Sequence, residues 1–156
     1  MSNFWLVKSE PSEFSIDDLE KSNNHTTHWD GVRNYQARNF IRDEMKISDK
    51  VLFYHSNTEP NAVVGVCEVV KEAYPDHTQF DSKNVHYDPK AEKKNPPWFM
   101  VDIKLEKKFK KPVSLEDIKA NPKLSKMRLV QRGNRLSVMP VTLDEFAEIL
   151  KMSNID

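Results

Sequence analysis

Glycine is scarce in this sequence, with only Gly31, Gly65 and Gly133 in a chain of 156 residues. Glycines at this spacing cannot form a GxGxxG turn or a Walker loop, which excludes the common ways of holding a dinucleotide or a nucleoside triphosphate. So few glycines also leave little room for a flexible linker, and the length is typical of one folded domain spanning residues 1–156.

Cysteine is scarcer still, because Cys67 is the only one in the chain. It has no partner for an internal disulfide, and its place in the apolar run AVVGVCEVV is typical of a packing thiol with a raised pKa. The two histidines of HTTH, His25 and His28, lack the carboxylate and the further ligands that zinc prefers. We therefore expect no metal ion and no cofactor.

A long apolar run is also missing at the start of the chain. The opening MSNFWLVKSEP has neither a basic stretch nor an apolar segment long enough to export or anchor a protein. We expect no membrane partner, and a cytoplasmic location in a bacterium or a nuclear location in a eukaryote.

The net charge is zero, and this balance hides two unequal halves. Residues 1–80 hold 8 Lys and Arg against 13 Asp and Glu, whereas residues 81–156 hold 16 against 11, so the halves carry −5 and +5. A basic run is often an ordinary solvated face, but it can also hold the phosphates of a nucleic acid. The candidates for phosphate contact are Lys107, Lys108, Lys110, Lys111, Arg132 and Arg135.

Apolar periodicity predicts strands mixed with short helices. Strands are expected over 4–8, 50–55, 62–73, 98–109 and 136–141, and helices over 15–21, 35–45, 114–121 and 142–153. The segment 75–97 is too polar and too rich in proline for regular structure, and it is a candidate lid. This irregular alternation favours an α+β fold, built on a small, twisted, mostly antiparallel β-barrel of about five to six strands with flanking short helices.

The segment HWDGVRNYQARNF, residues 28–40, concentrates aromatic and hydrogen-bonding side chains. Trp29 and Tyr35 flank a polar turn at an expected helix start, where backbone amides favour a polar or anionic ligand. An aromatic ring stacks on a nucleobase for about 1 to 3 kcal/mol, and polar side chains can match the edge of the base. The segment therefore predicts recognition of a base that is single-stranded or flipped out of a duplex.

Other aromatic residues have a structural interpretation beside the functional one. Trp5 and Trp98 fall on expected strands, where packing in the core is more common than lining a ligand site. Tyr87, in the irregular segment, could close over a ligand or pack on the surface.

Several segments resemble, in the same order along the chain, the EVE domain family. They are FWLVKSEP, WDGVRNYQARNF, VLFYHSN, EAYPDHTQFD, HYDPK, PWFMVDI and RLSVMPV. The resemblance implies a PUA-like fold and a relation to the YTH readers of N-methylated adenine, which also have a strand ending in Lys-Ser and a tryptophan before a helix. Here these positions are Lys8, Ser9 and Trp29.

Carried over to this sequence, the resemblance implies a base site with Trp29 as a stacking wall, further aromatic side chains around it and polar groups at the base edge. The candidate ligand-binding residues are Lys8, Ser9, Glu10, Trp29, Asp30, Asn34, Tyr35, Tyr54, His55, Ser56 and Tyr87. The acidic Glu10 and Asp30 would prefer a base that presents amino donors, so modified cytosine is as good a candidate as modified adenine.

The expected function is that of a reader without catalysis, which binds a methylated or hydroxymethylated cytosine or an N-methylated adenine in DNA or RNA. One alternative is a small enzyme acting on a nucleotide or base, with His55 as base and Glu10 or Asp30 as acid. Another is an adaptor that binds protein partners through its basic half. The sequence leaves open the kind of nucleic acid, the modification and the oligomeric state.

Overall fold

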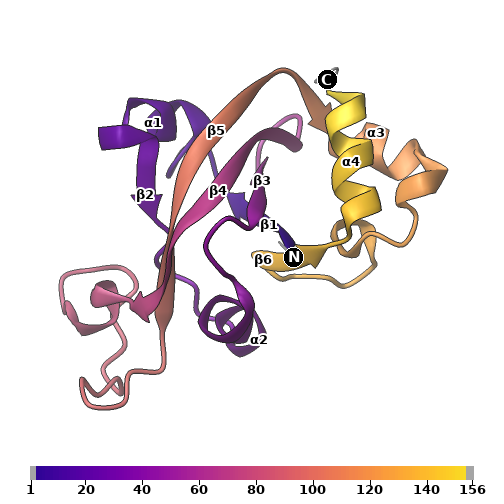
Figure 1. The fold of residues 1–156 in the computed structure, drawn as a ribbon. Coiled ribbons are helices and arrows are strands. Elements are labelled where there is room, and N and C mark those ends of the chain that lie inside the picture. Colours follow the sequence, from indigo (N-terminus) through magenta and orange to yellow (C-terminus); the bar gives the residue numbers. More distant parts are fainter. Residues whose placement is uncertain (1–2, 154–156) are drawn as a thin grey trace.

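Six strands form one mixed sheet in the computed structural model, which describes residues 3–153. The order across the sheet is β2-β5-β4-β3-β1-β6, and four of the five pairings are antiparallel, the exception being β1 with β3. The strands are β1 (Phe4–Ser9), β2 (Thr26–His28), β3 (Lys50–His55), β4 (Ala62–Pro75), β5 (Phe99–Ser114) and β6 (Val138–Val141). Figure 1 shows the long strands β4 and β5 curving side by side through the centre of the fold.

The prediction of an α+β fold with a mostly antiparallel sheet is confirmed. Among residues 3–153, β2 and β6 end the sheet without pairing to each other, so the barrel stays open. Pro140 lies on β6, at this edge, where a residue without a backbone N–H interrupts no inner ladder.

Short helices flank the sheet, and each expected helix has a counterpart. They are α1 (Ile16–Lys21), α2 (Tyr35–Asn39), α3 (Leu115–Ala120) and α4 (Leu143–Met152), with a π-helical turn η2 (Phe40–Glu44) after α2 and 3-10 turns η1 (Asn23–His25), η3 (His77–Phe80), η4 (Pro122–Leu124) and η5 (Arg128–Val130). Reciprocal capping boxes start two of them, from Ser15 with Asp18 and from Thr142 with Glu145. Within residues 3–153, none of the helices has the length and apolar character of a transmembrane helix.

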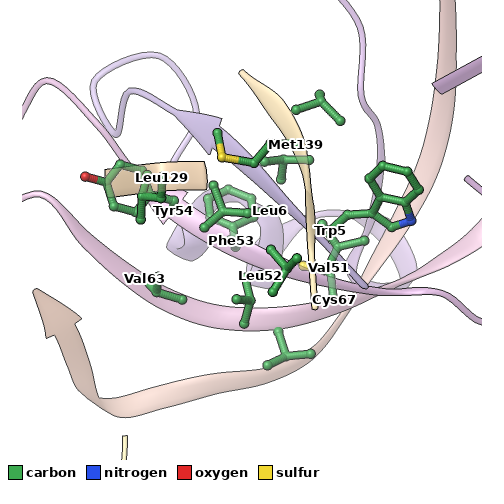
Figure 2. Close-up of a cluster of buried hydrophobic side chains, with 14 of the residues drawn as sticks. Trp5, Leu6, Val51, Leu52, Phe53, Tyr54, Val63, Cys67, Leu129 and Met139 are labelled. Carbon is green, nitrogen blue, oxygen red and sulfur yellow. The ribbon is translucent and has the colours of Figure 1, made fainter. Parts of the chain in front are cut away.

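The hydrophobic core is centred on β1 and β3. Figure 2 shows it from within, with the side chains of Trp5, Leu6, Val51, Leu52, Phe53, Tyr54, Val63, Cys67, Leu129 and Met139 labelled. Trp5 is only 2% exposed, and its indole Nε1 donates to the buried carboxylate of Asp49 at 2.9 Å. Burial raises the pKa of the Cys67 thiol, which leaves that residue as a packing group, as its sequence context predicts.

The segment between β4 and β5, residues 76–98, projects away from the sheet (Figure 1) and is called the excursion below. Its two ends are joined by the buried side chain of Gln79, whose Nε2 donates to the carbonyls of Asp76 at 2.7 Å and of Trp98 at 2.9 Å. Its Oε1 accepts from the Trp98 amide at 3.2 Å. Satisfied polar groups of this kind hold the base of the excursion against the sheet.

Candidate functional site

A cavity of about 770 Å³ opens where the end of β1 meets the loop after β2. Its walls also include Ser56 after β3, Val85 and His86 of the excursion, and Arg135 and Ser137 before β6. Segments that are far apart in the sequence therefore meet at one place, and the volume is within the range of small-molecule sites.

Six of the predicted ligand-binding residues line this cavity, namely Lys8, Ser9, Glu10, Trp29, Asp30 and Ser56. The other five lie outside its walls, namely Asn34, Tyr35, Tyr54, His55 and Tyr87. The structure thus brings the polar end of β1 and the Trp29 loop together, and it leaves the other aromatic candidates outside this cavity.

Trp29 is a fixed wall of the cavity. Its backbone N–H donates to the Val101 carbonyl at 2.7 Å, and its ring meets Phe53 edge to face with centroids 5.5 Å apart. Because the side chain is only 8% exposed, it presents a small part of its surface to the cavity and the rest to the core.

The polar groups at the end of β1 are partly engaged within the protein. The Ser9 hydroxyl donates to the Phe14 carbonyl at 2.6 Å, which leaves its oxygen free to accept. One carboxylate oxygen of Glu10 accepts from Asn57 Nδ2 at 2.6 Å. Lys8 is half-buried, and this burial lowers the pKa of its ammonium group because a charged group loses hydration.

The loop after β2 is held by Asp76, a fully buried residue that the sequence analysis did not single out. Its carboxylate accepts hydrogen bonds from the Gly31 amide at 2.7 Å, from Arg33 Nη1 at 3.1 Å and from the Thr78 amide at 2.8 Å. Burial alone would raise the pKa of Asp76, but the hydrogen bonds from Thr78, Gly31 and Arg33 outweigh it, and the pKa is lowered. An ionised Asp76 therefore fixes the loop that follows Trp29.

His86, also missed, covers this loop from the excursion. Gly31 has a φ of +80°, and a Cβ there would lie 2.5 Å from His86 Nε2, so both the backbone angle and the imidazole require glycine. Arg33 fastens the contact, because its Nε and Nη2 donate to the His86 carbonyl at 3.1 and 2.7 Å. The one sequence signal for this arrangement was a glycine in a polar turn of a glycine-poor chain.

Tyr35 lies outside the cavity, where it stacks on Trp98 with ring centroids 4.9 Å apart. We call this pair the Tyr35–Trp98 platform. The guanidinium groups of Arg38 and Arg33 lie over the Tyr35 and Trp98 rings at 5.0 and 5.3 Å, and the buried Trp98 donates from Nε1 to Asp88 at 2.8 Å. The platform fastens the excursion to α2, so these aromatic groups have a structural use.

The remaining predicted residues also have structural roles or lie apart. The Asn34 side chain caps α2, because its Oδ1 accepts a hydrogen bond from the Ala37 amide in the first turn. His55 Nε2 accepts from the Ile16 amide at 3.1 Å, and burial lowers the pKa of its imidazole. Tyr54 is buried in the core, which raises its pKa to about 12. Tyr87 is 42% exposed on the excursion.

A second cavity, of about 480 Å³, lies beside the first and is basic. Arg128, Arg132 and Arg135 line it, together with the amide side chains of Asn34 and Gln36. Arg135 lines both cavities, so the two adjoin at this residue. Two of the predicted phosphate contacts, Arg132 and Arg135, are therefore next to the candidate base site.

The basic run on β5 is placed differently. Its lysines, which line neither cavity, are Lys107, Lys108, Lys110 and Lys111. Lys108 forms an ion pair with Asp17 and lies 3.9 Å from a carboxylate oxygen of Glu20, and the bond to Asp17 raises the pKa of its ammonium group. This arrangement is typical of an ordinary solvated face.

The fold and the cavity define a PUA-like α+β domain with a polar site beside a tryptophan wall. Within that class the chain belongs to the EVE domain family, which matches residues 3–152.

Three relatives show how far this likeness extends. Thymocyte nuclear protein 1 of Rattus norvegicus is 44% identical over an alignment of 173 positions, which covers 100% of this chain and 76% of the rat protein. A solved hypothetical protein from Leishmania major has a TM-score of 0.93 and 47% identity, covering 99% of this chain and 96% of that one. Human THYN1 protein, solved in complex with DNA containing 5-methylcytosine, has a TM-score of 0.93 and 42% identity, covering 99% of each chain.

Proposed function

We propose that this chain is a reader, without catalysis, that binds a modified base of a nucleic acid in the cavity between β1 and the loop after β2. The observation that carries the proposal is the cavity itself, where Trp29 is a fixed wall and Ser9 and Glu10 offer acceptors. The human relative solved with DNA containing 5-methylcytosine supports DNA and methylated cytosine as the first candidates. Hydroxymethylated cytosine and N-methylated adenine, in DNA or RNA, are the further candidates.

Methylated cytosine matches the chemistry of the cavity walls. Its exocyclic amine is a donor that the carboxylate of Glu10 or Asp30 can accept. Its methyl group favours apolar contact, which Trp29 and Val32 provide from the wall of the cavity. The base reaches such a site only when it is unstacked, in a single strand or flipped out of a duplex.

The basic cavity offers a path for the phosphate backbone. Because Arg135 lines both cavities, a nucleotide in the first would direct a neighbouring phosphate towards Arg132 and Arg128. Guanidinium groups bind phosphate through paired hydrogen bonds whatever the base sequence. This surface would therefore supply affinity, while the first cavity would supply the choice of base.

The position of His55, the expected general base, does not favour the enzyme alternative. His55 lies outside the cavity walls, and its Nε2 already accepts a hydrogen bond from the Ile16 amide. A general base must reach the proton that it removes, directly or through one water molecule.

Fluorescence-anisotropy titration tests the proposal with matched DNA and RNA oligonucleotides at two salt concentrations. The set carries unmodified, methylated or hydroxymethylated cytosine, or unmodified or N-methylated adenine, in single strands and in duplexes. We expect a preference for one modified base that persists at higher salt, because salt weakens phosphate contacts and not the apolar contact with a methyl group. Salt-sensitive binding without any preference would contradict the proposal and would favour the enzyme or the adaptor.

A further inference from the structure

Three potential metal ligands come together on the rim of the cavity. Ligand atoms of His28, Asp30 and His77 all lie within 4.8 Å of one another. His28 Nε2 is 3.7 Å from Asp30 Oδ2, and the rings of His28 and His77 meet edge to face with centroids 5.1 Å apart. His25, the neighbour of His28 in the HTTH segment, is not part of this cluster, since its Nδ1 contacts the Glu20 carbonyl at 2.6 Å.

The backbone beneath the cluster is fixed although the side chains are accessible. His28 ends β2, which pairs with β5. Asp76 directly precedes His77, and its buried carboxylate accepts from the amide of Gly31, the residue after Asp30. One buried group therefore orders the backbone next to Asp30 and next to His77, which limits how far these two ligands can move apart.

The three side chains are free to act as ligands. Within residues 3–153, the only polar contact of these side chains is the one between His28 and Asp30, and the His77 ring packs on the His28 ring. Each imidazole can present a lone pair, and the Asp30 carboxylate, which is partly exposed, can present an oxygen.

We infer that His28, Asp30 and His77 bind one divalent transition-metal ion of the zinc class. Two imidazole nitrogens and one carboxylate oxygen suit Zn²⁺, Co²⁺ or Ni²⁺, whereas Mg²⁺ and Ca²⁺ prefer oxygen ligands alone. Atoms bound to one zinc ion at about 2.0 to 2.2 Å lie roughly 3.4 Å apart, so small rotations of the side chains complete the site. Three protein ligands leave a position for water or an incoming group.

The position of the site gives it an electrostatic consequence. His28 and Asp30 also line the first cavity, so a bound cation would add positive charge to a wall that carries Glu10 and Glu13. Metal binding at these three residues does not require base recognition, so it can be tested with the metal ion alone.

Calorimetric titration of the chain, without a histidine tag, with ZnCl₂ is the test. We expect one equivalent to bind, and MgCl₂ not to compete. His77→Ala should weaken zinc binding by at least roughly tenfold, and it leaves the cavity walls intact because His77 does not line them. His25→Ala, which removes another exposed histidine, is the matched control and should keep the affinity of the unaltered chain.

Two further measurements keep the test decisive. Thermal melting shows whether His77→Ala is folded, and Asp30→Asn, a near-isosteric change, should weaken zinc binding as well. The visible absorption of bound Co²⁺ should change in both variants and stay unchanged in His25→Ala. Saturable binding that survives His77→Ala and Asp30→Asn, or the absence of saturable binding to the unaltered chain, would overturn the assignment.

Discussion

Trp29 and Tyr35 belong to one short segment of the sequence, and the structure gives them opposite surroundings. Trp29 is 8% exposed and forms a wall of the 770 Å³ cavity, whereas Tyr35 is 62% exposed and stacks on Trp98. Both are aromatic residues beside a polar turn, so composition alone does not separate them. One aromatic-rich segment can therefore form the wall of a cavity and anchor a loop at the same time.

The two regions also differ in what supports them. The cavity wall depends on the buried carboxylate of Asp76, which binds the loop after β2 through several hydrogen bonds. In the Tyr35–Trp98 platform the backbone of Trp98 is bonded to the buried Gln79, but the two rings are held only by cation–π contacts and by the hydrogen bond from Trp98 Nε1 to the more accessible Asp88. We therefore expect the cavity to be the more rigid of the two, which suits the selection of one base.

The largest effect should come from removing the support of the cavity. Asp76→Ala leaves Arg33 without its buried carboxylate partner and the Gly31 amide without its acceptor, and a broken buried ion pair typically costs about 3 to 5 kcal/mol. Asp88→Ala, on the platform side, removes two more accessible hydrogen bonds, from Trp98 Nε1 and from the Lys90 amide, and should cost about 1 to 3 kcal/mol in total. Urea denaturation of both variants measures the free energy of unfolding, and equal losses would show that the two regions are supported alike.

The second largest effect should be a difference between Trp29 and Tyr35 in their contribution to the preference for a modified base. Trp29→Ala should reduce the preference for modified over unmodified base by roughly tenfold or more, since an aromatic contact with a base is worth about 1 to 3 kcal/mol. Tyr35→Ala should leave this ratio unchanged. Anisotropy with matched oligonucleotides gives both ratios, and Trp29→Phe, which keeps an aromatic ring, should give an intermediate value.

Circular dichroism should show that each aromatic variant is folded at the temperature of the titration. If Trp29→Ala weakens the binding of modified and unmodified oligonucleotides equally, Trp29 does not contribute to the preference for the modified base. Loss of the preference in Tyr35→Ala would move the site to the platform.

A smaller and less specific effect should follow from the basic cavity. Arg135→Gln should weaken the binding of modified and unmodified oligonucleotides alike, by roughly fivefold at low salt, and should lower the salt slope by about 1. Lys110→Gln, on the solvated face of β5, is the matched control and should change little. An equal loss with Lys110→Gln would place the phosphate path along β5, as the charge pattern of the sequence had suggested.

The smallest effect concerns acid stability on the cavity side. His55 packs edge to face on Phe53, which in turn contacts Trp29, and burial lowers the pKa of the His55 imidazole. The unfolded chain then binds more protons than the folded one, so stability is present above about pH 6.5 and is lost as the pH falls towards the lowered native pKa. His55→Gln should flatten this part of the curve of unfolding free energy against pH, and an unchanged slope would show that another group causes it.

Local signals in the sequence were sufficient for most elements of the fold. The capping boxes at Ser15 and Thr142 depend on residues three positions apart, and the helices that they start are present. The irregular excursion was predicted from its prolines and polar residues. The parallel pairing of β1 with β3 was not predicted, because it depends on the path of the chain between two strands and not on the pattern of either strand.

The candidate site was predictable only in part for the same reason. Trp29 was singled out from the aromatic and polar composition of residues 28–40 and Ser9 through the family resemblance, and both line the cavity. The sequence analysis did not single out Asp76, His86 or His77. Each of them contacts a residue far away along the chain: Asp76 contacts Gly31, His86 contacts Arg33, and His77 lies beside His28. Long-range hydrogen bonds leave no periodicity in a sequence, whereas helices and strands do.

We propose that the cavity beside Trp29, and not the Tyr35–Trp98 platform, receives the modified base. Nuclear magnetic resonance of an oligonucleotide carrying a ¹³C-labelled 5-methylcytosine methyl group tests it directly. We expect an upfield shift of the methyl signal on binding and Overhauser contacts to Trp29 and Val32, with both lost in Trp29→Ala. If the methyl signal does not shift, or if it contacts Tyr35 and Trp98 instead, the base does not bind in the cavity beside Trp29.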